Sequence, residues 1–430
     1  MGGFGSDAAA VDAVIDSDGL RSDRLGSDAM RSVSVLSMHT SPLTQPGTGD
    51  SGGMNVYVRE LSTSLAQRGL DVTVYVRRDS ADLADRVAVE PGLQVVHIDA
   101  GPVELPKERL PDVIEEFARG VAADGTAQRS DVIHANYWLS AEAGRQLKDM
   151  LDIPLVSTFH TLARVKAQFG DPEPHLREQV EFEVINCCDA ICVSNRVEAD
   201  QLIRLYHADA TRIDVVAPGV DHAFFSPGDR AGARAALGMG SDPTLLFVGR
   251  IQPLKGLDLA VAALAELPED VRLVAVGGPS GAEGPAELAK IRNMIDQLGL
   301  SNRVSFVPPQ PHHLLSTYYR AADVVVVPSR SESFGLVALE AAACGAPVVA
   351  AEVGGLRSLV HDGYTGYLID SRDPIDYAKR IEQILSDTEL AGALGRQGAA
   401  DARRYSWPAA ADQLHRLFDE VCSRSLVTCC

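Results

Sequence analysis

The sequence predicts an α/β protein built from two doubly wound domains that face each other across a cleft. The length of 430 residues exceeds the roughly 250–300 residues that one hydrophobic core usually supports. Short runs rich in Val, Ile and Leu alternate with amphipathic stretches, which is typical of a parallel sheet covered by helices on both faces. This alternation stops near residue 220 and then starts again.

Seven short apolar segments form the first series of expected strands. They are Ser32–Ser37, Asp71–Val76, Leu93–Ile98, Asp131–Ala135, Pro154–Phe159, Ala190–Ser194 and Ile213–Ala217. The clearest helix follows the first of them, because apolar residues recur there at helical spacing before a closing glycine. These residues are Met54, Val58, Leu61, Leu65 and the closing Gly69.

The second series of expected strands comprises Thr244–Val248, Val271–Val276, Val304–Val307, Asp323–Val327 and Pro347–Ala351. Turn residues cluster between the two series in Pro218–Asp229, which we interpret as the linker. The expected parts are a tail at 1–30, a first domain at 31–220, a second at 221–407, a helix at 408–424 and a tail at 425–430. We expect this last helix to pack back on the first domain.

Composition excludes several classes of partner. The formal charge of −20 argues against nucleic acid or an anionic membrane as the main partner, because both need a basic surface. No apolar stretch approaches the ~18 residues of a membrane span, and the start lacks a signal peptide. The seven cysteines show neither zinc-site spacing nor the density of a disulfide framework. We therefore expect a reduced, cytoplasmic chain with no stable membrane anchor.

The glycine-rich loop after the first strand suits a ligand that is not a dinucleotide. Gly47, Gly49 and Gly52 formally match G-x-G-x-x-G. However, about ten residues separate them from the strand, and the acidic residue of the dinucleotide fingerprint is missing. Gly52 and Gly53 let the backbone approach a ligand, and the helix start offers N–H groups to phosphate or sugar oxygens. A plain glycine-rich turn is the alternative.

Two loops of the second domain carry the charged residues of a nucleotide-sugar site. Arg250 and Lys255 lie just after a strand in Gly-Arg-Ile-Gln-Pro-Leu-Lys-Gly, a placement that suits a diphosphate. Glu332 and Glu340 flank an apolar helix start. A glutamate buried one turn inside a helix is costly without a partner, and the two hydroxyls of a ribose would be a suitable one.

These motifs together resemble a known family. G-R-x-x-P-x-K-G followed by E-S-F-G-L-V-x-x-E resembles the retaining nucleotide-sugar glycosyltransferases of GT-B architecture, which have two Rossmann-like domains. The N-terminal loop, with His39–Pro42, Gln45–Gly47 and Asp50–Tyr57, is similar to the D-inositol 3-phosphate glycosyltransferases of mycothiol biosynthesis. The resemblance runs from about Ser32 to Leu417. It implies transfer of N-acetylglucosamine from UDP-N-acetylglucosamine to 1D-myo-inositol 3-phosphate.

The resemblance implies these donor contacts: Gln45, Pro46, Gly53, Arg250, Lys255, Gln310, Glu332 and Glu340. Arg250 and Lys255 match the pair that grips the diphosphate and would stabilise it as it leaves. Glu332 matches a carboxylate near the sugar hydroxyls, and Glu340 matches the ribose ligand. Gln310 matches a position at which the family holds the uracil largely through the backbone. The family has Arg at this position.

The expected catalytic residues are Arg250, Lys255, His160 and Glu332. His160 lies just past a strand, where it could polarise a sugar hydroxyl or serve only as a structural group. No matched residue is placed as a nucleophile, so we expect front-face substitution through an oxocarbenium-like ion pair, with the leaving diphosphate taking the acceptor proton.

On the acceptor side, the resemblance implies His39, the loop residues Asp50, Ser51, Gly52, Gly53, Met54 and Asn55, and the phosphate cradle Lys107, Tyr137, Thr161 and Arg177. One lysine, one arginine and two hydroxyls suit a dianionic phosphate. Departures from the family pattern lie nearby, at Phe159, Asn136 and Ala167–Pro174. They leave open another acceptor, an aminocyclitol or a hexose phosphate.

The remaining expectations concern other readings of the chain, metals and assembly. Intact charged motifs disfavour a non-catalytic nucleotide-sugar sensor, and the E-x7-E element disfavours a UDP-sugar epimerase. The chemistry needs no cofactor. Tyr319, Arg320 and Ala322 match a structural magnesium site of the family, with carbonyl ligands that suit Mg²⁺. We expect a UDP-sugar donor and a phosphorylated cyclitol as ligands, a homodimer as the assembly, and no nucleic acid.

Overall fold

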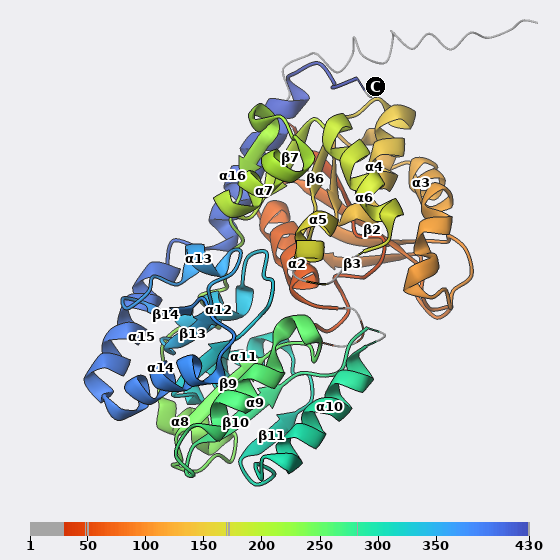
Figure 1. Cartoon of the computed structure of the whole chain (residues 1–430). Coiled ribbons are helices and arrows are strands. Elements are labelled where there is room, and N and C mark those ends of the chain that lie inside the picture. Colours follow the sequence, from red (N-terminus) through yellow and green to blue (C-terminus); the bar gives the residue numbers. More distant parts are fainter. Residues whose placement is uncertain are drawn as a thin grey trace, which may run out of the picture.

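The computed structural model describes residues 30–47, 49, 51–168, 170, 173–281 and 283–428. Nearly all of the predicted N-terminal tail, the loop residue Asp50 and the last two cysteines lie outside these residues. Two sheets, each with helices on both faces, form an upper and a lower lobe (Figure 1). The predicted fold class of two facing α/β domains is confirmed.

The first domain contains an eight-stranded sheet in the described residues, in the order β3-β4-β2-β1-β5-β6-β7-β8. Its strands are β1 (Ser32–Leu36), β2 (Asp71–Arg77), β3 (Arg86–Glu90), β4 (Leu93–Ile98), β5 (Val132–Asn136), β6 (Leu155–Thr158), β7 (Ala190–Val193) and β8 (Ile213–Val215). All pairs are parallel except β3 with β4. The sequence did not reveal β3, because this edge strand is only partly buried and lacks a continuous apolar run.

The second domain contains a six-stranded parallel sheet in the order β11-β10-β9-β12-β13-β14 within the described residues. Its strands are β9 (Thr244–Val248), β10 (Arg272–Val276), β11 (Val304–Val307), β12 (Val324–Val327), β13 (Val348–Ala351) and β14 (Gly366–Ile369). The sequence did not reveal β14, a four-residue edge strand that begins with glycine.

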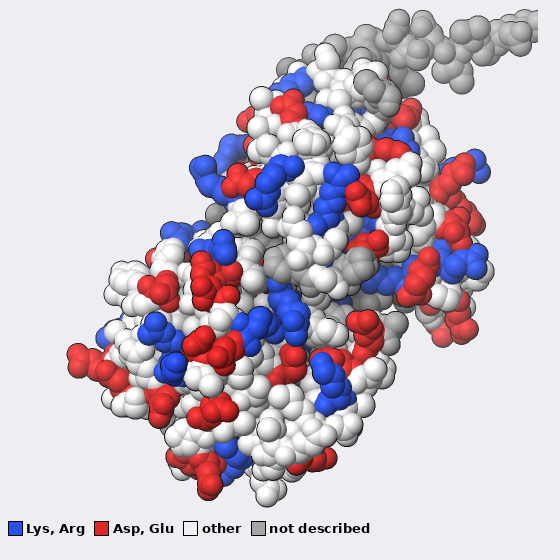
Figure 2. All heavy atoms as spheres, viewed as in Figure 1, with Lys and Arg blue, Asp and Glu red and all other residues white. Residues whose placement is uncertain are grey.

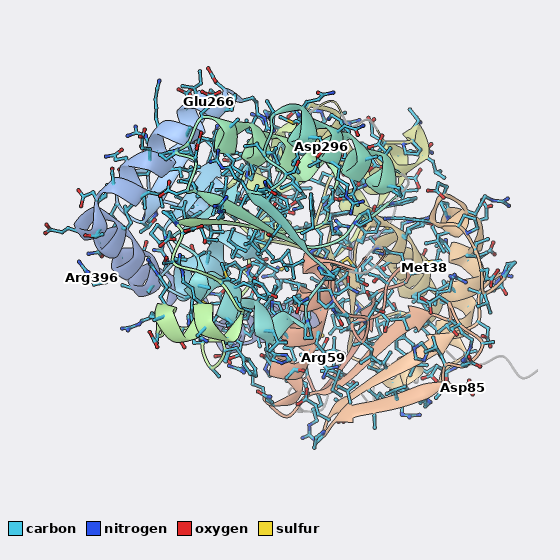
Figure 3. The ribbon with its side chains drawn as sticks, turned by 90° about the horizontal axis from the view of Figure 1, so that it is seen from below. Met38, Arg59, Asp85, Glu266, Asp296 and Arg396 are labelled. Atoms are coloured by element: carbon cyan, nitrogen blue, oxygen red, sulfur yellow. The ribbon has the colours of Figure 1, made fainter. Side chains whose placement is uncertain are left out.

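Helices cover both sheets. The first domain has α2 (Gly53–Ala66), α3 (Ile114–Ala122), α4 (Trp138–Leu151), α5 (Ala163–Gln168), α6 (His175–Cys187) and α7 (Arg196–Tyr206). The second has α8 (Arg230–Ala236), α9 (Leu257–Ala265), α10 (Gly284–Gln297), α11 (Leu315–Ala321), α12 (Leu336–Ala343), α13 (Leu356–Leu359), α14 (Pro374–Ser386) and α15 (Thr388–Ala402). In Figure 3, Asp85 beside β3 and Arg396 on α15 lie on opposite sides of the view.

The last helix, α16 (Trp407–Cys422), leaves the second domain and lies along the first, as the blue ribbon shows (Figure 1). Leu414 and Phe418 on its inner face are fully buried in the same apolar cluster as Leu61 of α2. The linker packs against the start of α16 at this place. A Cβ atom on Gly219 would lie 2.1 Å from the backbone nitrogen of Trp407, so the close approach of these two segments requires glycine here.

Acidic and basic side chains are mixed over the visible face of the molecule (Figure 2). No helix in the described part of the chain is long and apolar enough to cross a membrane.

Among the described cysteines, Cys188, Cys192, Cys344 and Cys422 are free, but Cys187 at the end of α6 is disulfide-bonded. The prediction of a wholly reduced chain is therefore wrong at Cys187, because spacing along the chain does not reveal which sulfur atoms meet.

Candidate active site

A cavity of about 330 Å³ lies between the two domains. Its walls are loops that follow strands of both sheets, which is where doubly wound folds bind ligands. The first domain contributes Gly52, Gly53, Met54, His160, Thr161 and Lys166, and the second contributes Arg250, Lys255, Pro309, Gln310 and Glu332. The volume falls within the range of small-molecule sites, about 300–1,000 Å³.

The predicted diphosphate cations face this cavity together. Lys255 ends the short helix η4 (Pro253–Lys255), and its ammonium lies 2.7 Å from a carboxylate oxygen of Glu332. Gly256 follows with φ +72°, and a Cβ atom there would lie 2.2 Å from the carbonyl oxygen of Pro328. The turn that presents Lys255 therefore requires glycine. Arg250 lies directly after β9 and lines the same cavity.

The glycine-rich loop of the first domain comes close to Arg250. A Cβ atom on Gly52 would lie 3.3 Å from Nε of Arg250. The side chain of Asn55 holds this loop in shape, because it donates to Thr40 Oγ1 (2.6 Å) and to the carbonyl oxygen of Ser41 (2.7 Å) and accepts from the Gly52 N–H (2.9 Å). Ser51 and Asn55 are buried and hold the loop, whereas Gly52, Gly53 and Met54 line the cavity.

The loop at residues 308–310 of the second domain, which is expected to bind the uracil, contacts the same glycine-rich loop. Gln45 donates a hydrogen bond to the carbonyl oxygen of Pro309 (3.2 Å), and Gln310 donates to that of Pro308 (2.9 Å). Pro46 and Gln310 line the cavity. The side chain of Gln310 is thus used within its own loop, which agrees with a base contact made by backbone.

Glu340 lies behind the cavity wall. Its carboxylate accepts hydrogen bonds from Tyr319 (2.8 Å) and from Nε2 of His312 (2.7 Å), and the cavity outlined by the described residues does not reach it. Burial opposes a charge on His312, but the negative charge and hydrogen bond of Glu340 outweigh burial and raise the pKa of His312. Each oxygen keeps a second lone pair, so contact with a ribose stays a prediction. Sequence reasoning missed His312.

His160 lines the cavity from the first domain in a left-handed conformation, with φ +61°. Burial, and then the neighbouring His134, lowers the pKa of His160 to about 3. The ring is therefore neutral near pH 7. Nε2 lies 2.9 Å from the side-chain oxygen of Asn136, so Nε2 carries the ring proton and Nδ1 can accept a hydrogen bond from a hydroxyl.

The predicted phosphate-cradle residues come from two loops and two helices of the first domain, with Lys107 at the start of the short helix η1 (Lys107–Val113). Tyr137 follows β5, Thr161 follows β6, and Arg177 on α6 donates to both of their hydroxyls, at 3.2 and 2.9 Å. The ring of His39, after β1, lies 4.4 Å from that of Tyr137. Burial and the charge of Lys107 hold the pKa of His39 well below its ordinary value. The fold thus gathers residues that lie far apart in the sequence.

Nδ1 of His39 is a buried polar atom that has no hydrogen-bond partner within the described residues. Such an atom usually marks a place where a ligand or water completes the site. The sequence pattern also missed other side chains of this region, namely Lys166, Glu173, Glu181, Asn195 and Ser333. Lys166, Glu173, Glu181 and Asn195 belong to no local motif with a recognisable spacing, whereas Ser333 lies in the motif E-S-F-G-L-V-x-x-E but was given no role there.

The residues matched to magnesium do not make a cation site with their side chains. The hydroxyl of Tyr319 is used by Glu340, and the guanidinium of Arg320 binds the carbonyl oxygens of Phe224 and Ser226. Ala322 offers only its backbone. The described residues contain no cluster of three or more His, Cys, Asp or Glu side chains able to hold a metal. These side chains are therefore used within the fold, and a magnesium site made by the carbonyl oxygens of Tyr319, Arg320 and Ala322 stays a prediction.

Both halves of the chain match models of glycosyltransferase families. Residues 52–219 match the glycosyl transferase 4-like domain, and residues 230–401 match the glycosyl transferases group 1. Among solved structures, sucrose-phosphate synthase from Thermosynechococcus elongatus is similar, with a TM-score of 0.85 and 32% identity over 91% of this chain and 98% of that one. Anabaena HepE in complex with UDP and glucose shares the fold, with a TM-score of 0.75 and 20% identity over 91% of this chain and all of that one.

Curated relatives resemble the chain along most of its length. The D-inositol 3-phosphate glycosyltransferase of Mycolicibacterium smegmatis is 49% identical over 89% of this chain and 90% of its own. That of Xylanimonas cellulosilytica is 46% identical over 91% and 97%. With this identity across both domains of a GT-B fold, the chain belongs to the D-inositol 3-phosphate glycosyltransferase family.

Proposed function

We propose that this enzyme transfers N-acetylglucosamine from UDP-N-acetylglucosamine to 1D-myo-inositol 3-phosphate with retention at the anomeric carbon, as the first step of mycothiol biosynthesis. One observation carries the proposal. A cluster that suits a phosphate, with Tyr137, Thr161 and Arg177, reaches the interdomain cavity at Thr161, and the cations Arg250 and Lys255 line the same cavity.

The donor side supports transfer chemistry. Arg250 and Lys255 would hold the diphosphate and stabilise the charge that grows on it as the bond to the anomeric carbon breaks. The acceptor oxygen attacks from the same face, and its proton passes to the departing diphosphate. Glu332 orients Lys255 through their 2.7 Å ion pair. The neutral His160 is suited to accept a hydrogen bond from a sugar hydroxyl while it stays anchored to Asn136.

The test is turnover of UDP-N-acetylglucosamine by the purified protein with inositol 3-phosphate, with free inositol, and with no acceptor. We expect UDP release with the phosphorylated cyclitol alone, and an α-linked product by NMR, since the donor is an α-glycoside. Release with free inositol at the same rate, or with neither cyclitol, would contradict the proposed acceptor.

A hexose phosphate is the second candidate acceptor. The likeness to sucrose-phosphate synthase, at 32% identity and a TM-score of 0.85, favours it. Fructose 6-phosphate in the same assay, with UDP-glucose and with UDP-N-acetylglucosamine, distinguishes the two candidates. We further propose a cytoplasmic homodimer, which light scattering and fractionation of cells would test.

A further inference from the structure

The guanidinium of Arg177 has all of its N–H groups engaged in this structure. Nε donates to Glu181 (2.7 Å). One terminal nitrogen donates to Tyr137 (3.2 Å) and Glu173 (2.9 Å), and the other to the carbonyl and hydroxyl oxygens of Thr161 (2.8 and 2.9 Å). Because a guanidinium carries only five N–H donors, a phosphate can bind Arg177 only by replacing one of these partners.

Glu173 is the partner that can leave. Glu181 is fully buried and also accepts hydrogen bonds from the backbone N–H of Ala163 (2.9 Å) and from the hydroxyl of Tyr206. The Thr161 carbonyl belongs to the backbone, and the hydroxyls of Tyr137 and Thr161 are themselves suited to a phosphate. The side chain of Glu173, in contrast, is 20% exposed and can turn toward solvent.

The carboxylate of Glu173 lies among three positive charges. It forms ion pairs with Arg177 and with Lys166, whose side chain lines the interdomain cavity beside Thr161. Burial opposes its ionisation, yet the charges of Arg177, Lys166 and Lys107 keep the pKa of Glu173 below its ordinary value. A small anion surrounded by two lysines and an arginine is the arrangement that a phosphate monoester would need.

We propose that Glu173 stands in for the phosphate of the acceptor, and that Lys166 is a further ligand of that phosphate. The inference rests on the proposed function, because it assigns the acceptor phosphate to this cradle. An entering phosphate monoester displaces the Glu173 side chain and takes over its contacts with Arg177 and Lys166. A neutral polyol carries no charge with which to displace a carboxylate, so Glu173 makes the site selective for phosphorylated acceptors.

The test compares the KM for inositol 3-phosphate in Glu173→Gln, Lys166→Met and the wild-type enzyme. Glu173→Gln removes the competing charge, so this KM should fall about five- to tenfold, while the KM for the UDP-sugar is unchanged. Lys166→Met should raise the same KM about tenfold. Glu178→Gln is the matched control, because Glu178 lies on α6 next to Arg177 but pairs with Arg164 (2.7 Å) outside the cradle.

An unchanged or higher KM for inositol 3-phosphate in Glu173→Gln, with thermal unfolding like that of the wild type, overturns the inference. A higher value would mean that Glu173 only holds Arg177 in place. Calorimetric titration with inorganic phosphate separates this failure from failure of the proposed function. If the wild type does not use inositol 3-phosphate, tighter phosphate binding by Glu173→Gln still supports the inference, whereas equal binding or none in both proteins overturns it.

Discussion

The side-chain hydroxyl of Ser333 donates a hydrogen bond to the backbone carbonyl of His160 and thereby joins the two domains beside the cavity. Asn195 adds a second link, since Nδ2 donates to the Ser333 carbonyl oxygen (2.6 Å) while Oδ1 accepts from the backbone N–H of Glu198 (3.0 Å) and caps α7. Ser333 directly follows Glu332. These links therefore set the position of His160 relative to the charged residues of the other domain.

The link through Asn195 predicts a loss of turnover without a loss of fold. Asn195→Asp keeps the oxygen that caps α7 but replaces the donor to Ser333 by an oxygen that repels its carbonyl. We expect kcat to fall about tenfold, as for one lost hydrogen bond that orients catalytic groups, with little change in Tm. Asn186→Asp, at an exposed residue of α6, is the control. A normal kcat in Asn195→Asp would show that the link does not position the site.

Lys255→Ala should lower kcat by about a hundredfold or more and change the KM for the UDP-sugar much less. The ammonium stabilises the charge that appears on the diphosphate as it leaves, so its loss affects the transition state more than the bound donor. Steady-state kinetics measure both constants. Lys379→Ala, at an exposed residue of α14, is the control. A rise in KM alone would contradict this role.

His312 should make stability depend on pH. Glu340, with Glu60 and Asp221 nearby, raises the pKa of His312 despite its burial. A raised folded-state pKa stabilises the fold fully below the unfolded pKa of about 6.5, and this stabilisation is lost as the pH rises through the folded value. His312→Gln should therefore lower Tm more at about pH 6 than at about pH 9. An equal loss at both would show that His312 packs there without a charge.

Gly219→Ala should destabilise the protein where the linker crosses the start of α16. The added Cβ would lie 2.1 Å from the nitrogen of Trp407 and 2.3 Å from the carbonyl carbon of Ser406, and backbone cannot yield as a side chain can. We expect a loss of about 2–3 kcal/mol in the free energy of unfolding, measured by denaturant titration. Gly240→Ala is the control, because no described atom lies within 4 Å of its added Cβ. A similar loss in both variants would contradict this account.

The donor side of the site was largely predictable. Arg250 and Lys255 belong to one short loop after a strand, and Glu332 and Glu340 flank one helix start, so their chemistry is visible in local order. The acceptor side was different. Lys107 and Arg177 lie 70 positions apart, and only the resemblance to a family joined them.

What the sequence alone left out follows a physical pattern. The edge strand β3 lacks the two-sided burial that gives a buried strand its continuous apolar run. The edge strand β14 is mostly buried, but it is only four residues long and begins with glycine. The partner of Glu340, the stand-in role of Glu173 and the contact between Ser333 and His160 depend on atoms brought within hydrogen-bonding distance by the fold.

The sequence by itself determined the two layered domains, the break between them, and the loops that carry the donor chemistry. Continuous apolar strands and helical spacing arise from burial, which acts on each segment in the same way wherever it lies in the chain. Only the tertiary structure decided which side chains meet across the cavity and which charges compete for the phosphate cradle. Hydrogen bonds and ion pairs act over a few ångströms of space, and that proximity has no counterpart in the order of residues along the chain.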